Sequence, residues 1–410
     1  MKIRLIAKSR RPQLGLAVAV VLVLALGLLL SACAPPAAPV APAQQPAEPA
    51  QAPAAEPTAE PAQEPAPKTM DKVVWVSPRG TLEVMDDFNM WVAKKMGYFD
   101  EMGLDVELQP GPLEALAVTK LVAEGQADVG YPSPGVLLAS LDAGMPLIQP
   151  WEMMLGQTFN FAVKPDSDIQ TVQDLAGKTI SLGSEGWQVI VDPILVEAGV
   201  DPSTVEYLNA GNQWAQAVAL GQADAGLAWR GLTAQWGAQG LDLRYLIGTD
   251  FSTQPSNGYA IRAADLDDPA MKDMWERFFR ANSMAFDLAR RNPRCAAQMV
   301  YEEFPAVREQ MSPQLAFDSM IELADLYFQS YQEGLGYGYN DMENWQKYID
   351  TVYGLGQIQT DYPADQVVTN VLIEAANNFD VDRVKADAES CELDEQWQAV
   401  DDSGVPWSMD

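Results

Sequence analysis

Two stretches of the sequence share one pattern, LVAEGQADVG at residues 121–130 and AVALGQADAG at residues 217–226. In each stretch an apolar helical run ends at a glycine, Gly125 or Gly221, and glycine commonly terminates helices. The GQAD turn then leads into a short apolar run of the kind that forms a buried strand. The same helix–turn–strand step at two separate places predicts two similar α/β lobes.

Strand-like and helix-like runs alternate around these stretches. Residues 73–76 form a short apolar run, residues 86–96 carry apolar side chains at helical spacing, and residues 179–182 again resemble a strand. This alternation is typical of α/β layers with mixed, mostly parallel sheets. After a further strand at 259–261, helical runs continue to the end of the chain, so extra C-terminal helices are expected.

The N-terminal segment predicts export. Basic residues within 1–11 precede the uncharged apolar run 14–30, and small residues stand directly before Cys33. This is the layout of a secretory signal, here residues 1–32. A cysteine at the cleavage point resembles the lipobox of bacterial lipoproteins, so we expect lipidation of Cys33 and an extracytoplasmic, membrane-anchored protein. The alternative is a plain transmembrane anchor, because the apolar run just reaches across a bilayer.

A stalk should separate this anchor from the folded part. The tract that follows Cys33 is mostly Ala and Pro with some Gln and Glu, and it has too little apolar surface to offset the entropy of ordering. The remaining chain is long enough for two lobes with their own cores. The predicted division is a stalk at 33–69, lobe 1 at 71–159 plus 257–410 with the C-terminal helices, and lobe 2 at 160–256.

Net charge and residue usage exclude several functions. The formal charge is −31, and a surface this acidic repels phosphate backbones, so nucleic acid is not an expected partner. The chain contains no histidine, which removes the commonest general base and zinc ligand. Beyond Cys33 only Cys295 and Cys391 remain, without a CxxC motif. They form either a disulfide, as an extracytoplasmic location allows, or two buried thiols; no metal is expected.

Four motifs carry a family resemblance: FNMWVAKKMGYF at 88–99, MGLDV at 102–106, GQADV at 125–129 and DLAGKTI at 174–180. In their order and spacing the chain resembles the substrate-binding proteins of ABC importers, which have the type II periplasmic-binding-protein fold. Within them it is similar to the NMT1/THI5-like group, whose members bind nitrate, sulfonates, taurine or thiamine pyrimidines. The helical region beyond residue 265 is longer than this resemblance implies.

The resemblance implies a mechanism and partners. Two lobes joined by crossover strands would close on a small molecule by hinge motion, with hinges near residues 158–162 and 251–258. The closed form would deliver the ligand to an ABC permease and its ATPase. A monomer without a cofactor is expected.

Ligand contacts are expected where strands end and the following helices begin. The predicted site residues are Ser77, Arg79, Ser133, Ser184, Glu185, Gly186, Trp187, Trp214, Trp229 and Arg230. Several have structural alternatives. Ser133 can be an ordinary N-cap, Arg79 can be solvated rather than paired with an anion, and Trp187 can be core.

Tryptophan usage suggests the class of ligand. Trp151, Trp187, Trp214 and Trp229 stand at or beside predicted strand ends, and aromatic rings facing a cleft stack on flat ligands. The sequence therefore favours a planar heteroaromatic, such as a thiamine pyrimidine precursor or a riboflavin-like molecule. The alternative is a sulfonate, taurine or nitrate. Glu152 and Glu185 would disfavour an anion if they reach the cleft, and otherwise they are surface charge.

Two other functional classes were weighed. The pyrimidine synthase of the THI5 group shares the fold, and this relationship implies a histidine-bearing pocket and a Cys-rich iron site. Neither exists in this sequence, so we expect a binding protein rather than an enzyme. A sensory lipoprotein that is not coupled to transport is a further alternative.

Overall fold

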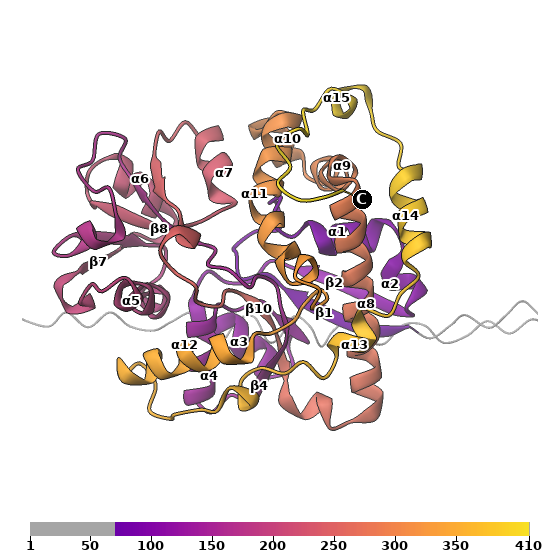
Figure 1. Ribbon diagram of the computed structural model, residues 1–410, viewed down its shortest axis with the longest axis horizontal. Coiled ribbons are helices and arrows are strands. Elements are labelled where there is room, and N and C mark those ends of the chain that lie inside the picture. The colour runs from indigo at the N-terminus through magenta and orange to yellow at the C-terminus, as the bar shows by residue number, and fades with distance from the viewer. Residues whose placement is uncertain (1–69, 410) are drawn as a thin grey trace, which may run out of the picture. The chain divides into compact units, whose positions relative to one another are not determined.

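The computed structural model describes residues 70–409 (Figure 1). The predicted signal peptide, the lipidation site Cys33 and the stalk lie outside the described residues. Within 70–409, no helix combines the length and the apolar character that crossing a membrane requires.

The first sheet contains five strands in the order β2-β1-β3-β10-β4. Their bounds are β1 Asp71–Val76, β2 Leu104–Gln109, β3 Val129–Gly130, β4 Leu147–Glu152 and β10 Gly258–Arg262. β1 is parallel to β2 and β3, whereas β10 is antiparallel to β3 and β4. Four strands therefore share one direction, and the strand that returns from the second sheet opposes them.

The second sheet repeats this arrangement with the order β7-β6-β8-β5-β9. Its strands are β5 Phe159–Val163, β6 Thr179–Leu182, β7 Glu206–Asn209, β8 Ala225–Trp229 and β9 Arg244–Leu246. β6 is parallel to β7 and β8, and β5, the first strand after the crossover, is antiparallel to β8 and β9. The predicted class, a two-lobe α/β fold with mixed and mostly parallel sheets, is confirmed.

Helices cover both sheets (Figure 1). They are α1 Phe88–Lys95, α2 Tyr98–Glu101, α3 Ala115–Ala123, α4 Pro134–Asp142, α5 Gln188–Glu197, α6 Trp214–Ala219, α7 Leu232–Ala238, α8 Pro269–Arg291, α9 Pro293–Glu303, α10 Pro305–Gln310, α11 Pro313–Gln332, α12 Met342–Gly354, α13 Ile373–Ala376, α14 Val381–Ser390 and α15 Glu395–Gln398. Several begin with proline, whose missing N–H costs nothing in the first turn. The N-caps Asp268, Asn292 and Ser312 accept backbone N–H bonds there.

The long C-terminal helices enlarge the first lobe. α8 packs on α1, α13 and α14, and α9 packs on α1 and α11. Buried aromatic side chains from these helices join those of the first sheet in one core, where Trp151 stacks on Phe279 with ring centroids 4.9 Å apart. The extra helices are therefore an integral part of the first lobe's core.

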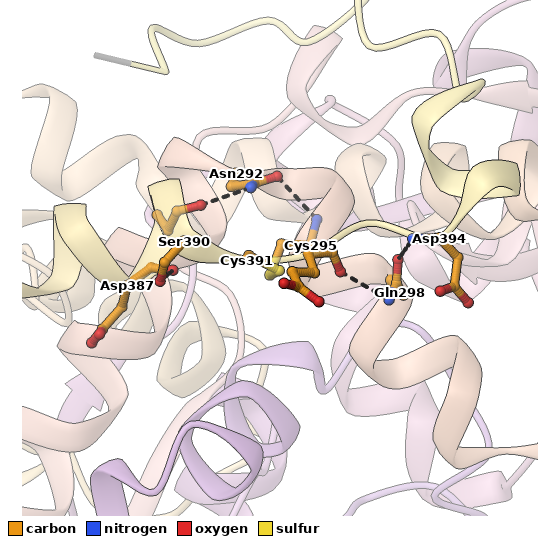
Figure 2. The surroundings of a disulfide bond; sticks show 9 residues. Asn292, Cys295, Gln298, Asp387, Ser390, Cys391 and Asp394 are labelled. Atoms are coloured by element: carbon orange, nitrogen blue, oxygen red, sulfur yellow. Dashed lines mark hydrogen bonds between the residues drawn. A yellow bond between two sulfur atoms is a disulfide. The ribbon is translucent and has the colours of Figure 1, made fainter.

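A disulfide joins Cys295 on α9 to Cys391 at the end of α14 (Figure 2). Asn292 caps α9 by accepting from the Cys295 N–H at 3.1 Å, and its amide donates to the Ala388 carbonyl at 2.9 Å. Gln298 accepts from the Asp394 N–H at 3.1 Å on the other side. Of the two states that the sequence left open for these cysteines, the structure has the bonded one, and it fixes α14 against α9.

Two C-terminal helices also reach the second lobe. α11 lies beside α7 (Figure 1), where the Ser319 hydroxyl donates to the Gly231 carbonyl at 3.2 Å. α12 packs on α5, and just beyond α12 the Gln357 amide donates to Asp192 at 2.8 Å. The C-terminal helices thus contact both lobes, a role that the sequence did not reveal.

Candidate functional site

A cavity of about 420 Å³ lies between the two sheets, within the size range of small-molecule sites. Its wall draws on the carboxyl ends of β1, β3 and β8 and on residues of α3, α4, α6 and α7. Apolar and aromatic side chains dominate the lining. The main contributors are Arg79, Val84, Leu113, Glu114, Tyr131, Ser133, Thr158, Phe159, Trp187, Trp214, Gln216, Trp229, Leu232, Gln235, Trp236 and Asn257.

Four tryptophans form one continuous part of this wall. Trp187 meets Trp214 edge-on at 5.5 Å between ring centroids, Trp214 stacks on Trp229 at 6.2 Å, and Trp236 meets Trp214 at 5.6 Å. Trp187 can approach this closely because position 183 is glycine. A Cβ at Gly183 would stand 2.6 Å from the Trp187 ring. The glycine at position 183 thus makes room for the Trp187 indole.

Arg79, the single arginine of the wall among residues 70–409, is paired with two carboxylates. Its guanidinium contacts Asp87 at 2.7 Å and Asp86 at 3.2 Å, and both carboxylates are almost fully buried. It also lies over the Tyr131 ring, 5.6 Å from the centroid. Burial raises the pKa of Asp87, and the neighbouring Arg79 partly opposes this shift. Because two carboxylates surround it, Arg79 offers little free positive charge to an anionic ligand.

Two helix N-termini at the cavity are also occupied or deprived of donors. At the start of α3 the Glu114 side chain accepts from the Leu116 N–H at 3.2 Å, which puts a carboxylate where a bound anion would sit. The helix α4 begins with Pro134, which has no N–H. A Cβ at the next residue, Gly135, would be 2.5 Å from the Val189 carbonyl oxygen, so that position is covered by the second lobe.

Half of the predicted site residues reach the cavity. The wall contains Arg79, Ser133, Trp187, Trp214 and Trp229 and leaves out Ser77, Ser184, Glu185, Gly186 and Arg230. The buried Ser77 hydroxyl accepts from the Arg79 N–H at 3.2 Å and shapes the turn instead. Arg230 pairs with Asp325 on α11 at 3.3 Å, which turns its charge toward the first lobe.

The segment 184–186 serves the contact between the lobes. Ser184 is half-buried and Glu185 is exposed. A Cβ at Gly186 would come within 2.9 Å of the Ala115 Cβ at the start of α3. Gly186 therefore permits the second lobe to approach the first.

Two residues that we considered for the cleft belong to the interior of the first lobe. Trp151 is fully buried and packs against Gly338, where a Cβ would lie 2.2 Å from the ring. Glu152 is buried on the same strand and accepts from the Trp345 indole N–H at 3.1 Å. Burial raises the pKa of Glu152 well above its ordinary range. Trp151 packs against Phe279 of α8, Glu152 lies under α12, and both are absent from the cavity wall.

Sequence reasoning overlooked several lining residues. Tyr131 and Thr158 directly adjoin strands, Trp236 lies within α7, and Asn257 precedes β10. The signal that could have found three of them is their place at strand boundaries. Trp229 is the last residue of β8, so it lies at a strand end as the sequence predicted.

The strand orders of the two sheets and the cavity between them are those of the type II periplasmic-binding-protein fold. This fold defines the class of the protein. Residues 86–296 match the family model described as NMT1/THI5 like, which is about half of the chain. The chain belongs to this family, as the motifs at 88–180 indicated.

Similar proteins were found among curated sequences and solved structures. The 4-amino-5-hydroxymethyl-2-methylpyrimidine phosphate synthase THI13 of Saccharomyces cerevisiae is 26% identical over 140 residues, covering 34% of this chain and 41% of the relative. The chain thus spans less than half the length of this relative.

Among solved structures, the alkanesulfonate-binding protein SsuA from Xanthomonas axonopodis, bound to MOPS, has a TM-score of 0.56 at 14% identity, covering 75% of this chain and 99% of that one. The periplasmic aliphatic sulphonate binding protein SsuA from Escherichia coli has a TM-score of 0.53 at 16% identity, covering 74% and 92%. At these identities the likeness concerns the fold.

Proposed function

We propose that this protein is the extracytoplasmic solute-binding component of an ABC importer, and that it captures an uncharged planar heteroaromatic molecule between its lobes. A thiamine pyrimidine precursor or a riboflavin-like ring fits this description. The observation that carries the proposal is the wall of four tryptophans beside an arginine whose charge is already matched by two carboxylates. In this proposal Cys33 carries the lipid anchor, and the protein works as a monomer with a permease and an ATPase.

The aromatic wall supports a flat ligand. Trp187, Trp214 and Trp229 present ring edges and faces from three different elements of the second lobe. Stacking on such rings stabilises a planar molecule by dispersion and by expelling water. The cavity volume of about 420 Å³ leaves room for a single small ring system.

The electrostatics of the wall argue against a small oxyanion. A sulfonate or nitrate needs free cations or unoccupied helix N-termini. Here Arg79 is held by Asp86 and Asp87, and Glu114 caps α3 with its own carboxylate. The sulfonate binders share the fold with this chain, but at 14–16% identity their ligands do not indicate which ligand this wall binds.

Catalysis is not part of the proposal. The relatives called synthases match only a third of this chain. The wall offers no cysteine among the lining residues within 70–409, and the sequence has no histidine. Among residues 70–409, the cavity wall thus lacks the histidine and the cysteines that the synthase relationship implies.

A thermal-shift and calorimetric screen of residues 70–410 tests the ligand class. Riboflavin, thiamine, 4-amino-5-hydroxymethyl-2-methylpyrimidine, taurine, ethanesulfonate and nitrate would be compared. A ligand that binds only the native state raises the melting temperature. A shift with a ring and none with the anions is expected. A shift with sulfonate or nitrate alone would reverse the assignment of the ligand class. A sensory role would show as ligand binding together with cellular uptake of that ligand that persists when the gene for this protein is deleted.

A further inference from the structure

We infer that Ser133, Thr158 and Asn257 form hydrogen bonds with the polar edge of the ligand, and that they select a ring carrying a hydrogen-bond donor beside an acceptor. This inference rests on the proposed function and deepens it. Such an edge occurs in an aminopyrimidine or in the lactam edge of a flavin. The tryptophan wall would then hold the ring faces while these three residues decide which ring is accepted.

All three residues carry a buried polar atom that the fold leaves unsatisfied. Ser133 Oγ, Thr158 Oγ1 and Asn257 Oδ1 have no hydrogen-bond partner among residues 70–409, and all three residues line the cavity. Ser133 is 4% exposed and Thr158 is 2% exposed. A buried polar group without a partner costs roughly 1–3 kcal/mol, so a fold retains one where a ligand supplies the missing bond.

Ser133 shows the point most clearly. It occupies the N-cap of α4, where a serine hydroxyl normally accepts a backbone N–H bond and stabilises the helix by about 1 kcal/mol. Its side chain makes no such bond here. The capping role that the sequence allowed is therefore not used, and the hydroxyl of this lining residue has no partner within residues 70–409.

Backbone contacts gather the three residues at one place. The Gly258 N–H donates to the Pro132 carbonyl at 3.3 Å, which brings the segment after Asn257 beside Ser133. The Thr158 N–H donates to Ser256 Oγ at 3.4 Å, and the Met153 N–H donates to the Asn257 carbonyl at 3.1 Å. Thr158 and Asn257 thus lie on the two crossovers that connect the sheets, held side by side.

The chemistry of these atoms specifies the ligand edge. A hydroxyl donates one bond and accepts others, while an amide oxygen only accepts. The ligand must therefore offer at least one donor, and an adjacent acceptor for a hydroxyl proton. A ligand bound to both crossovers would also link recognition to the segments that flex when the lobes move.

Calorimetry with two ligand pairs tests the inference. The probes are 4-amino-5-hydroxymethyl-2-methylpyrimidine with its 4-dimethylamino analogue, and riboflavin with N3-methylriboflavin. The wild-type protein should bind one parent ring at least tenfold more tightly than its methylated analogue. Thr158→Val and Ser133→Ala should each weaken binding of that parent by about tenfold, since each bond lost is worth about 1.4 kcal/mol.

The melting temperatures of the variants show whether these hydroxyls act in ligand recognition or in holding the fold. Because both hydroxyls lack partners, Thr158→Val and Ser133→Ala should leave the melting temperature of the ligand-free protein unchanged or raised. The matched control is Ser283→Ala on α8, which removes a buried unpartnered hydroxyl outside the cavity wall and should not alter affinity. If the wild type binds a ring but the two variants or the methylated analogues bind equally well, the inference fails and the proposed function stands. If no ring binds, both fail.

Discussion

The indole N–H of Trp229 donates to the carboxylate of Asp86 at 3.0 Å, and this bond connects the second sheet to the first lobe. The Gln235 amide donates to the other oxygen of the same carboxylate at 3.2 Å. A Cβ at Gly231 would be 2.4 Å from that oxygen, so the second lobe reaches Asp86 only because a glycine follows β8. One buried carboxylate thus pairs with Arg79 in its own lobe and receives two donors from the other.

Substituting Trp229→Phe should open the ligand-free protein. The ring remains but the donor to Asp86 is lost, and a hydrogen bond to a charged group contributes roughly 1.5–3 kcal/mol. Small-angle scattering should report a larger radius of gyration, with a loss of ligand affinity of about tenfold. Trp214→Phe is the control, because its indole N–H donates to Leu227 within the second lobe. Equal scattering from both variants would contradict a closing role for the Asp86 bond.

Substitutions at two tryptophans should affect different properties, ligand affinity at Trp187 and thermal stability at Trp151. Trp187→Phe removes part of the cavity wall and should weaken ring binding by about tenfold or more. Trp151→Phe leaves a void beside Phe279 in the first core, at a cost of about 1–3 kcal/mol, and should lower the melting temperature without changing affinity. Calorimetry and thermal denaturation of both variants check this. Unaltered binding by the Trp187 variant would remove that residue from the site.

Removing the disulfide should affect stability alone. Cys295 and Cys391 are 96 residues apart, and a bridge closing a loop of this length contributes about 2–5 kcal/mol. The double substitution Cys295→Ser with Cys391→Ser should lower the melting temperature by several degrees, as should a reducing agent on the wild type. Neither cysteine lines the cavity, so affinity at 25 °C should persist. A parallel loss of affinity would mean that α14 supports the site.

Glu322 predicts a pH dependence of stability. Burial on α11 raises its pKa to about 8, and nearby Asp86 adds to the shift while Arg230 opposes it. Between about pH 4.5 and 8 the folded protein holds a proton that the unfolded chain has released, so stability falls as pH rises through this window. Glu322→Gln should flatten the decline in melting temperature. The exposed Glu343, whose pKa is lowered by Lys347, provides the control Glu343→Gln, which should leave the decline in place.

Local pattern was enough for the elements of the fold. Strand β6 lies at the predicted residues 179–182, and the repeated GQAD turns do precede β3 and β8. These segments were predictable because buried strands and glycine-terminated helices depend on side chains close in sequence. The strand β9 escaped prediction because its three residues are only partly apolar and it is defined by pairing with β5.

The candidate site also has a part that the sequence could predict and a part that it could not. The sequence by itself determined that strand ends carry Arg79, Ser133, Trp187, Trp214 and Trp229, all of which line the cavity. It could not show that Asp86 and Asp87 neutralise Arg79, that Gly183 admits the Trp187 ring, or that Thr158 and Asn257 meet on neighbouring crossovers. Thr158 and Asn257 are far apart in the chain, whereas the contacts of Arg79 with the two aspartates and of Gly183 with Trp187 join near neighbours whose loops are shaped by the rest of the fold. Only the tertiary structure decides them, because the path of a loop after its strand, and therefore which side chains meet there, depends on the elements that pack around it.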